Sequence, residues 1–573
     1  MKYIKTAIIS IVVIVTVLIL LDQSNKIKQE KIDKTNLNAT NEKSKVTTSY
    51  ANEPVITSNG LIPIIYDKDG NPIENFDKKD WYSYKKEDKK WANAITKDQN
   101  SNITGYYVWI PRFAYKITYK DPNDKTKEGE IDVKFLIGNS DQYVDDDGKI
   151  KNAVHIQTDE LNSLNSYVVH PSFISDSKNS YKNGGWSSEI EGFWISKYPA
   201  TYQQTSLGNE LTDEEKNKII YSNNSYYINE EDTYINEYNV YGEITNKTRI
   251  SYPTFMPLAY TYTKINIGDA TNLTRQIAKN NSFYNLKNID SHLVKISEWS
   301  AMAYLTQSDY GNGNSKKINN YYILEENDDN SQINRITGLS QELDAEKIFF
   351  SDDNLENMNY YNTKEGQKSS STGNIYGIYD IAGGVNEYLA GYIKNGNKLI
   401  EKSGNSNGKY KFYNEESTRY ITKYPYNKDN DMIKTNFEEY MKGNYYGDSM
   451  KELSNNEMMS WRAYLNYPFR DHPFFCKAGS AFLNGNFGIF AISRTRGDIS
   501  ENYGFRVCLI NEWKNMTLLG FRQYDTKKDS YSIKIILNDI TLTAIINSSY
   551  LLILKKTRLI YIIKTLKKST FDT

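Results

Sequence analysis

The sequence is poor in the residues that build metal sites and disulfide frameworks. Among 573 residues it has four histidines and two cysteines, and no two histidines lie within ten positions of each other. A local histidine cluster with metal-ligand spacing is therefore excluded, as is a fold held together by several disulfides. The formal net charge is only −1. Because this gives no overall attraction to phosphate backbones, we expect no nucleic-acid partner.

Tyrosine, in contrast, is abundant, with 49 residues in an aromatic content of 13%. Its apolar ring and polar tip suit both exposed binding surfaces and hydrated cores. The accompanying richness in Lys, Asn and Ile gives a second explanation, an AT-rich genome. The composition thus indicates a low-GC bacterial source, and it leaves open whether the tyrosines serve binding.

The N-terminus has the pattern of an export signal. Residues 6–21 are uncharged and apolar, and they follow Lys2 and Lys5. No small-x-small cleavage pattern follows, so we predict an uncleaved signal anchor or transmembrane helix at 1–21 rather than a cleaved signal peptide. Residues 22–54 are polar and predict a flexible linker. The expected localisation is the cell membrane, single-pass, with the bulk of the chain extracytoplasmic.

Residues 55–160 predict a β-rich extension. The segment 60–73 places DKDGN between two apolar runs, a pattern typical of a β-hairpin. The aromatic and β-branched run 105–119 predicts one long strand. Pro111 lies within this run, which places the strand at a sheet edge or at a bulge.

Four ordered motifs follow, at 192–204, 292–307, 371–392 and 477–507. They read GFWISKYP, SEW, YDIAGGVNEY and KAGS…GFRV in their most characteristic parts. In order and spacing they resemble the domain of the formylglycine-generating-enzyme (sulfatase-modifying factor) family. That resemblance implies an α+β fold: an irregular C-type lectin-like domain of the sulfatase-modifying-factor type, with long insertions, at 190–512 behind the N-terminal helix.

Two of these motifs also predict local structure. Apolar spacing predicts a helix over 292–307, with Trp299 as a core anchor and Glu298 as a solvated or capping residue. The GFRV segment predicts a closing strand, in which Phe505 and Val507 share one face.

The chemistry known for this family requires atoms that are missing here. The resemblance implies a copper-binding cysteine pair shortly after Gly479-Ser480, where this chain has residues near Leu483 and Gly488. The related non-haem iron branch needs a His-x-x-x-His-x-Glu pattern, which is also absent. We therefore assign no catalytic residue and lean against an enzyme.

The segment 481–503 instead has the composition of a recognition loop. Its aromatic, amide and arginine side chains resemble those of paratopes and of the variable segments of lectin-fold binding proteins. An ordinary irregular loop rich in turn formers is the alternative. The candidate binding residues are Asn484, Asn486, Phe487, Arg494, Arg496, Asp498, Asn502 and Tyr503.

Two further sites are open at this stage. The family resemblance implies calcium near Asp380 and Glu387, with a buried, hydrogen-bonded carboxylate as the alternative; no other cofactor is indicated. Cys476 and Cys508 flank the loop, and they are either bridged or free and buried.

The tail 513–573 has no counterpart in the family. It alternates like a strand and then becomes basic and apolar, which suits either a membrane surface or an unselected extension of the reading frame. Taken together, the sequence predicts a membrane-anchored binding protein with an unknown protein or glycan ligand. The alternatives are an enzyme of the same family with unrecognised chemistry and a pilin-like or cell-envelope structural component.

Overall fold

The computed structural model describes most of the chain between residues 51 and 511. The described residues are 51–56, 60–155, 166–175, 185–202 without 187, 252–312 without 264 and 280–282, 336–340, 359–394, 419–425, 446–477 without 455–458, 462, 470 and 471, and 488–511 without 498–501. Strands within 225–249 and 521–562 are described as backbone only. The predicted anchor at 1–21 lies outside these residues. Among the helices that are described, none has the length and apolar character to cross a membrane.

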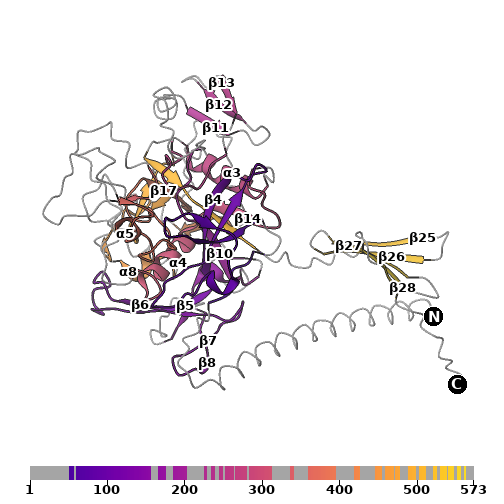
Figure 1. Ribbon diagram of the computed structural model, residues 1–573, viewed down its shortest axis with the longest axis horizontal. Coiled ribbons are helices and arrows are strands. Elements are labelled where there is room, and N and C mark those ends of the chain that lie inside the picture. Colours follow the sequence, from indigo (N-terminus) through magenta and orange to yellow (C-terminus); the bar gives the residue numbers. More distant parts are fainter. Residues whose placement is uncertain are drawn as a thin grey trace. The chain divides into compact units, whose positions relative to one another are not determined.

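The chain is a mixed, sheet-rich fold with few helices, as the α+β prediction required. Among the described residues, the largest sheet has seven strands in the order β14-β24-β10-β4-β3-β1-β2, and Figure 1 shows β4 and β10 side by side although they lie far apart in the sequence. The strands are β1 (Ile62–Tyr66), β2 (Pro72–Ile73), β3 (Asn93–Lys97), β4 (Ile103–Pro111), β10 (Gly192–Ser196), β14 (Asp290–Leu293) and β24 (Val507–Ile510).

A second sheet carries the last part of the domain. Its order is β18-β17-β21-β22. Strand β23 pairs in parallel with the first residues of β17, at the edge opposite to β21. These strands are β17 (Asn386–Lys394), β18 (Thr422–Pro425), β21 (Phe474–Lys477), β22 (Ile492–Thr495) and β23 (Tyr503–Phe505).

Smaller sheets and short helices complete the described elements. The sheets comprise β5 (Phe113–Thr118) with β6 (Glu130–Phe135) and β9 (Val168–Val169), β7 (Gln142–Val144) with β8 (Ile150–Asn152), β15 (Leu339–Ser340) with β16 (Asn359–Tyr360), β19 (Met459–Ser460) with β20 (Ala463–Tyr464), and β11 (Ser225–Ile228) with β12 (Tyr234–Tyr238) and β13 (Ile244–Arg249). The helices are η1 (Lys78–Asp80), η2 (Pro171–Phe173), α3 (Ile267–Ile277), α4 (Ile296–Gln307), α5 (Lys364–Gln367) and α8 (Met450–Leu453). The tail forms an antiparallel sheet of β25 (Phe521–Asp525), β26 (Ser530–Leu537), β27 (Ile540–Ile546), β28 (Leu551–Lys555) and β29 (Ile560–Ile562).

The β-rich extension predicted at 55–160 is built into the same sheet as the later motifs. The predicted hairpin forms: β1 pairs antiparallel with β2, and Asp67 Oδ1 accepts hydrogen bonds from the backbone N–H groups of Asp69 and Asn71. Gly70 closes the turn at φ +84°, a conformation that disfavours a side chain. β4 then pairs with β10 over five residues, so the extension and the later motifs share one core.

The single strand predicted at 105–119 is wrong. The segment divides at Arg112 into β4 and β5, which belong to different sheets. Pro111 is the last residue of β4, a strand inside the sheet rather than at its edge. At the end of a strand, the missing N–H of proline removes no ladder bond that the sheet requires, so an interior strand tolerates it.

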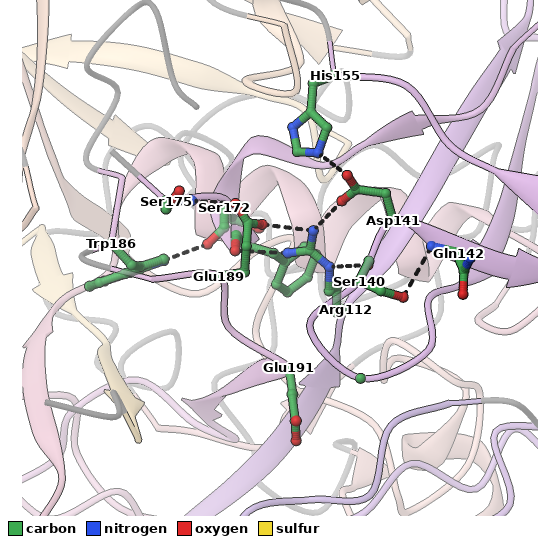
Figure 2. A network of polar contacts seen from close by, with 12 residues as sticks. Arg112, Ser140, Asp141, Gln142, His155, Ser172, Ser175, Trp186, Glu189 and Glu191 are labelled. Atoms are coloured by element: carbon green, nitrogen blue, oxygen red, sulfur yellow. Dashed lines mark hydrogen bonds and ion pairs between the residues drawn. The ribbon is translucent and has the colours of Figure 1, made fainter. Parts of the chain in front are cut away.

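Arg112 is the reason for the division. Its guanidinium is fully buried and donates to the backbone oxygens of Ser140 and Phe173 at 3.0 and 2.9 Å. It also lies 2.9 Å from Asp141 Oδ1 and 2.7 Å from Glu189 Oε2. Figure 2 shows this one side chain at the centre of contacts from three loops. A buried arginine that is paired on all sides fixes the turn between two sheets.

The helix predicted at 292–307 begins later than expected. Residues His292 and Leu293 belong to strand β14, and α4 runs from Ile296 to Gln307. The capping interpretation of Glu298 is confirmed, because its Oε2 accepts the backbone N–H of Lys295 at 2.9 Å. Trp299 is buried in the main core, as expected.

Candidate functional site

The sequence motifs meet at the buried side chain of Arg506. Its Nε donates to Glu387 Oε2 at 2.7 Å. Its two terminal nitrogens donate to the backbone oxygens of Ser196 and Lys197, at 3.1 Å each, and of Tyr379, at 2.5 Å. One residue of the closing motif therefore holds the end of β10 and two positions, Tyr379 and Glu387, of the 371–392 motif. The GFRV strand was expected to be continuous; instead it breaks at Arg506 into β23 and β24, which join different sheets.

A second buried cation completes this network from the other side of Glu387. Lys477 Nζ lies 3.6 Å from Glu387 Oε1 and donates to the backbone oxygens of Asp380, Gly383 and Val385 at 3.0, 2.8 and 3.2 Å. Burial lowers the pKa of the Lys477 amine, and the charge of Glu387 opposes that effect. Glu387 thus pairs with two buried cations that belong to the two ends of one loop.

The backbone anchors the loop at that same residue. Glu387 on β17 is the register partner of Lys477 on β21 and of Gly504 beside it on β23. The loop therefore begins at the end of β21 and ends on β23, and these two strands flank β17 on either side of Glu387, with Lys477 and Gly504 both buried. An irregular segment on a rigid base is the usual construction of a binding loop.

Helix α4 is hydrogen-bonded to the loop through Trp299. Trp299 Nε1 donates to the backbone oxygen of Ile489 at 3.0 Å, and both residues are buried. Ala491 N–H donates to Gly488 O at 3.0 Å and closes a turn before β22 begins at Ile492. The turn at 488–491 is thus attached to the core, and β22 continues from it.

Half of the candidate binding residues lie within the described part of the loop. Arg494 is half-buried, with Nη1 3.3 Å from Tyr467 O and its guanidinium 4.6 Å from the Phe469 ring centre. Arg496 is exposed. Tyr503 stacks on Tyr388, with ring centres 5.1 Å apart. The remaining members of the candidate set are Asn502, which accepts the Asn386 N–H at 3.0 Å through its backbone oxygen, and Asn484, Asn486, Phe487 and Asp498, which lie outside the described residues.

Asp380 and Glu387, the predicted calcium ligands, are both buried. Asp380 is buried at φ +57°, and its Oδ2 accepts the Gly338 N–H at 2.9 Å. Burial raises the pKa of Asp380 to about 6, although Arg506 and Lys477 lower it. The backbone oxygens that a calcium ion would use are bonded to the Lys477 ammonium, so an ion there would have to displace it. The calcium site stays a prediction.

Cys476 and Cys508 are not bridged in the structure. Both thiols are free and buried. Cys476 lies on β21 and Cys508 on β24, strands of two different sheets, so the two cysteines do not face each other. The alternative of two buried free thiols is the one that the structure contains.

Sequence analysis missed the role of the charged residues inside the motifs. Lys477 and Arg506 were treated only as parts of strand patterns, whereas their side chains form the base of the loop. The available signal was a charged residue inside an otherwise apolar strand pattern, which marks either an exposed face or a buried pair. Only the pairing partner decides between the two.

No protein-family model matches this chain. No curated protein matches it either.

Proposed function

We propose that this chain is a membrane-anchored extracytoplasmic binding protein, and that its domain is of the C-type lectin-like, sulfatase-modifying type. The 481–503 loop recognises a protein or glycan ligand on a cell surface. The observation that carries the proposal is the attachment of both loop ends to Glu387 through Lys477 and Arg506.

The domain assignment is supported by the way in which the resembling motifs contact one another. Arg506 and Glu387 occupy matching positions of two motifs and form a buried ion pair. Arg506 also bonds to Ser196 and Lys197 of a third motif. Motifs that were identified by their order in the sequence therefore meet at one buried side chain, which supports a single domain of the type that they resemble.

The recognition role is supported by the side chains around the loop. Exposed Arg496 and half-buried Arg494 supply positive charge. Phe469, which lies against the Arg494 guanidinium, and Tyr503, which stacks on Tyr388, supply aromatic surface. Aromatic groups held in place beside arginines are the usual anchors of a binding surface, and the positive charge favours ligands that carry anionic groups.

The extracytoplasmic location is supported by the apolar run at 6–21 and its basic head. It would place the 481–503 loop where a surface ligand can reach it.

Binding to glycan arrays and to intact cells tests the proposal, with the full chain solubilised in detergent. Arg496→Ala should weaken binding to the ligand that the native chain selects by about tenfold, and added salt should reduce native binding. Lys149→Ala is the matched control, because it removes one exposed positive charge from the β7–β8 turn instead. Equal binding by the native chain and Arg496→Ala, or equal losses in both variants, would refute recognition through the loop.

A further inference from the structure

A second buried cluster joins one nitrogen, one oxygen and one sulfur ligand. His292 on β14, Glu298 in the first turn of α4 and Cys508 on β24 each offer an atom that lies within 4.8 Å of the other two. All three side chains are fully buried. His292 and Cys508 are direct partners across the β14–β24 ladder, and His292 Nε2 lies 2.9 and 3.0 Å from the two carboxylate oxygens of Glu298.

We propose that His292, Glu298 and Cys508 bind one divalent transition-metal ion of the zinc class. Imidazole, carboxylate and thiolate are the ligands that zinc takes in proteins, and sites with three protein ligands leave a fourth position open. Zinc ligands lie about 2.0–2.3 Å from the metal, which puts them roughly 3.5 Å apart. The three atoms therefore need only a small contraction around an ion. Calcium and magnesium are disfavoured, because two of the three ligands are not oxygen.

Metal binding at this site exchanges protons and involves no redox step. In the absence of an ion the Cys508 thiol lies fully buried beside Glu298 and carries its proton. Binding releases that proton to solvent and forms the metal–sulfur bond. The imidazole proton moves from Nε2 to Nδ1, while Nε2 binds the ion. Among the described residues, Nδ1 has no hydrogen-bond partner.

Lys295 places a positive charge beside the proposed metal site. Its ammonium lies 3.6 Å from Glu298 Oε1, where it opposes a second cation. It is also held by Arg419 O at 3.1 Å and by the Trp186 ring, whose centre is 3.8 Å away. Glu298 is therefore not its only partner, and one carboxylate oxygen can turn to the ion. The ammonium should nevertheless weaken metal binding, so replacing Lys295 with an uncharged residue should strengthen it.

The complete burial of the three ligands means that the ion enters while the chain folds. The full chain is therefore stripped of metal, unfolded and refolded with cobalt(II), a coloured substitute for zinc. We expect one cobalt ion per chain and an absorption band from cobalt–thiolate charge transfer. Cys508→Ser should lose the band, whereas Cys476→Ser, which changes the other buried thiol, should keep it. Absence of the band in the native chain, or its survival in Cys508→Ser, would overturn the proposal.

A second variant keeps the test decisive if Cys508→Ser does not fold. Lys295→Met removes the neighbouring charge but none of the three ligands. It should bind zinc at least tenfold more tightly than the native chain when both are refolded in the presence of zinc and a competing chelator. An affinity equal to that of the native chain, or a lower one, would place any bound ion elsewhere and contradict the site.

Discussion

Glu387 Oε2 and Arg506 Nε lie 2.7 Å apart, across 119 positions of the chain, with both side chains buried. The pair joins the two sheets, because β17 carries Glu387 and Arg506 stands between β23 and β24. Buried charges are costly unless they are paired. The pair therefore holds the two motifs in one fixed arrangement.

Glu387→Gln should be strongly destabilising. The substitution keeps the shape but removes the carboxylate with which Arg506 and Lys477 are paired. Loss of one partner of a buried pair lowers the free energy of unfolding by about 3–5 kcal/mol. Urea unfolding followed by circular dichroism measures this. Glu365→Gln, which removes an exposed carboxylate paired with Lys368, is the control and should change the free energy little.

Asp380 should make stability fall as pH rises through the mildly acidic range. Burial raises its folded-state pKa to about 6, above its ordinary value of 3.8. The folded state then binds the proton more tightly than the unfolded state. Asp380 therefore destabilises the folded state least below pH 4 and most above pH 6. Asp380→Asn removes that dependence. Relative to the native chain, the variant should gain up to about 3 kcal/mol between pH 4 and pH 6. A constant difference between the two proteins across that range would contradict the raised pKa.

Trp299→Phe should loosen the loop locally. The substitution removes the hydrogen bond to Ile489 O and leaves that oxygen buried without its donor. Amide hydrogen exchange of Ala491, whose N–H bonds to Gly488 O, should accelerate roughly tenfold, equivalent to about 1.4 kcal/mol. Trp81→Phe removes a comparable bond, to Asn93 O, and serves as the control. If Trp81→Phe accelerates Ala491 as much, the effect is global and the specific contact is not responsible.

The two cysteines should be unreactive in the folded protein. Both are fully buried and burial raises the pKa of each, so little thiolate is accessible. Alkylation should be slow in native buffer and should reach two groups per chain after denaturation without reductant. Mass spectrometry counts the groups. A denatured, unreduced chain that takes up none would restore the disulfide.

Copper-dependent formylglycine formation should not occur. The residues near Leu483 and Gly488, where the resembled family has its copper-binding cysteines, supply no sulfur ligand. Incubation of the copper-loaded chain with a cysteine-containing sulfatase peptide should leave the peptide mass unchanged, while a family enzyme that has the cysteine pair converts it. Measurable turnover would favour the enzyme alternative over the binding function.

The sequence by itself determined the local structure. The Asp67–Gly70 turn and the cap that Glu298 gives to α4 were both predicted, because each depends on residues within a few positions of one another. The order of the four motifs was equally available, since it requires no knowledge of pairing.

The tertiary structure alone decided which distant residues meet. The breaks at Arg112 and Arg506 depend on partners from other loops and sheets, so a local alternation pattern cannot place them. Pro111 ends an interior strand because β10 happens to lie beside it. The same reason separates Cys476 from Cys508 and brings Cys508 to His292: sheet order, which arises from burial of the whole core, sets these distances.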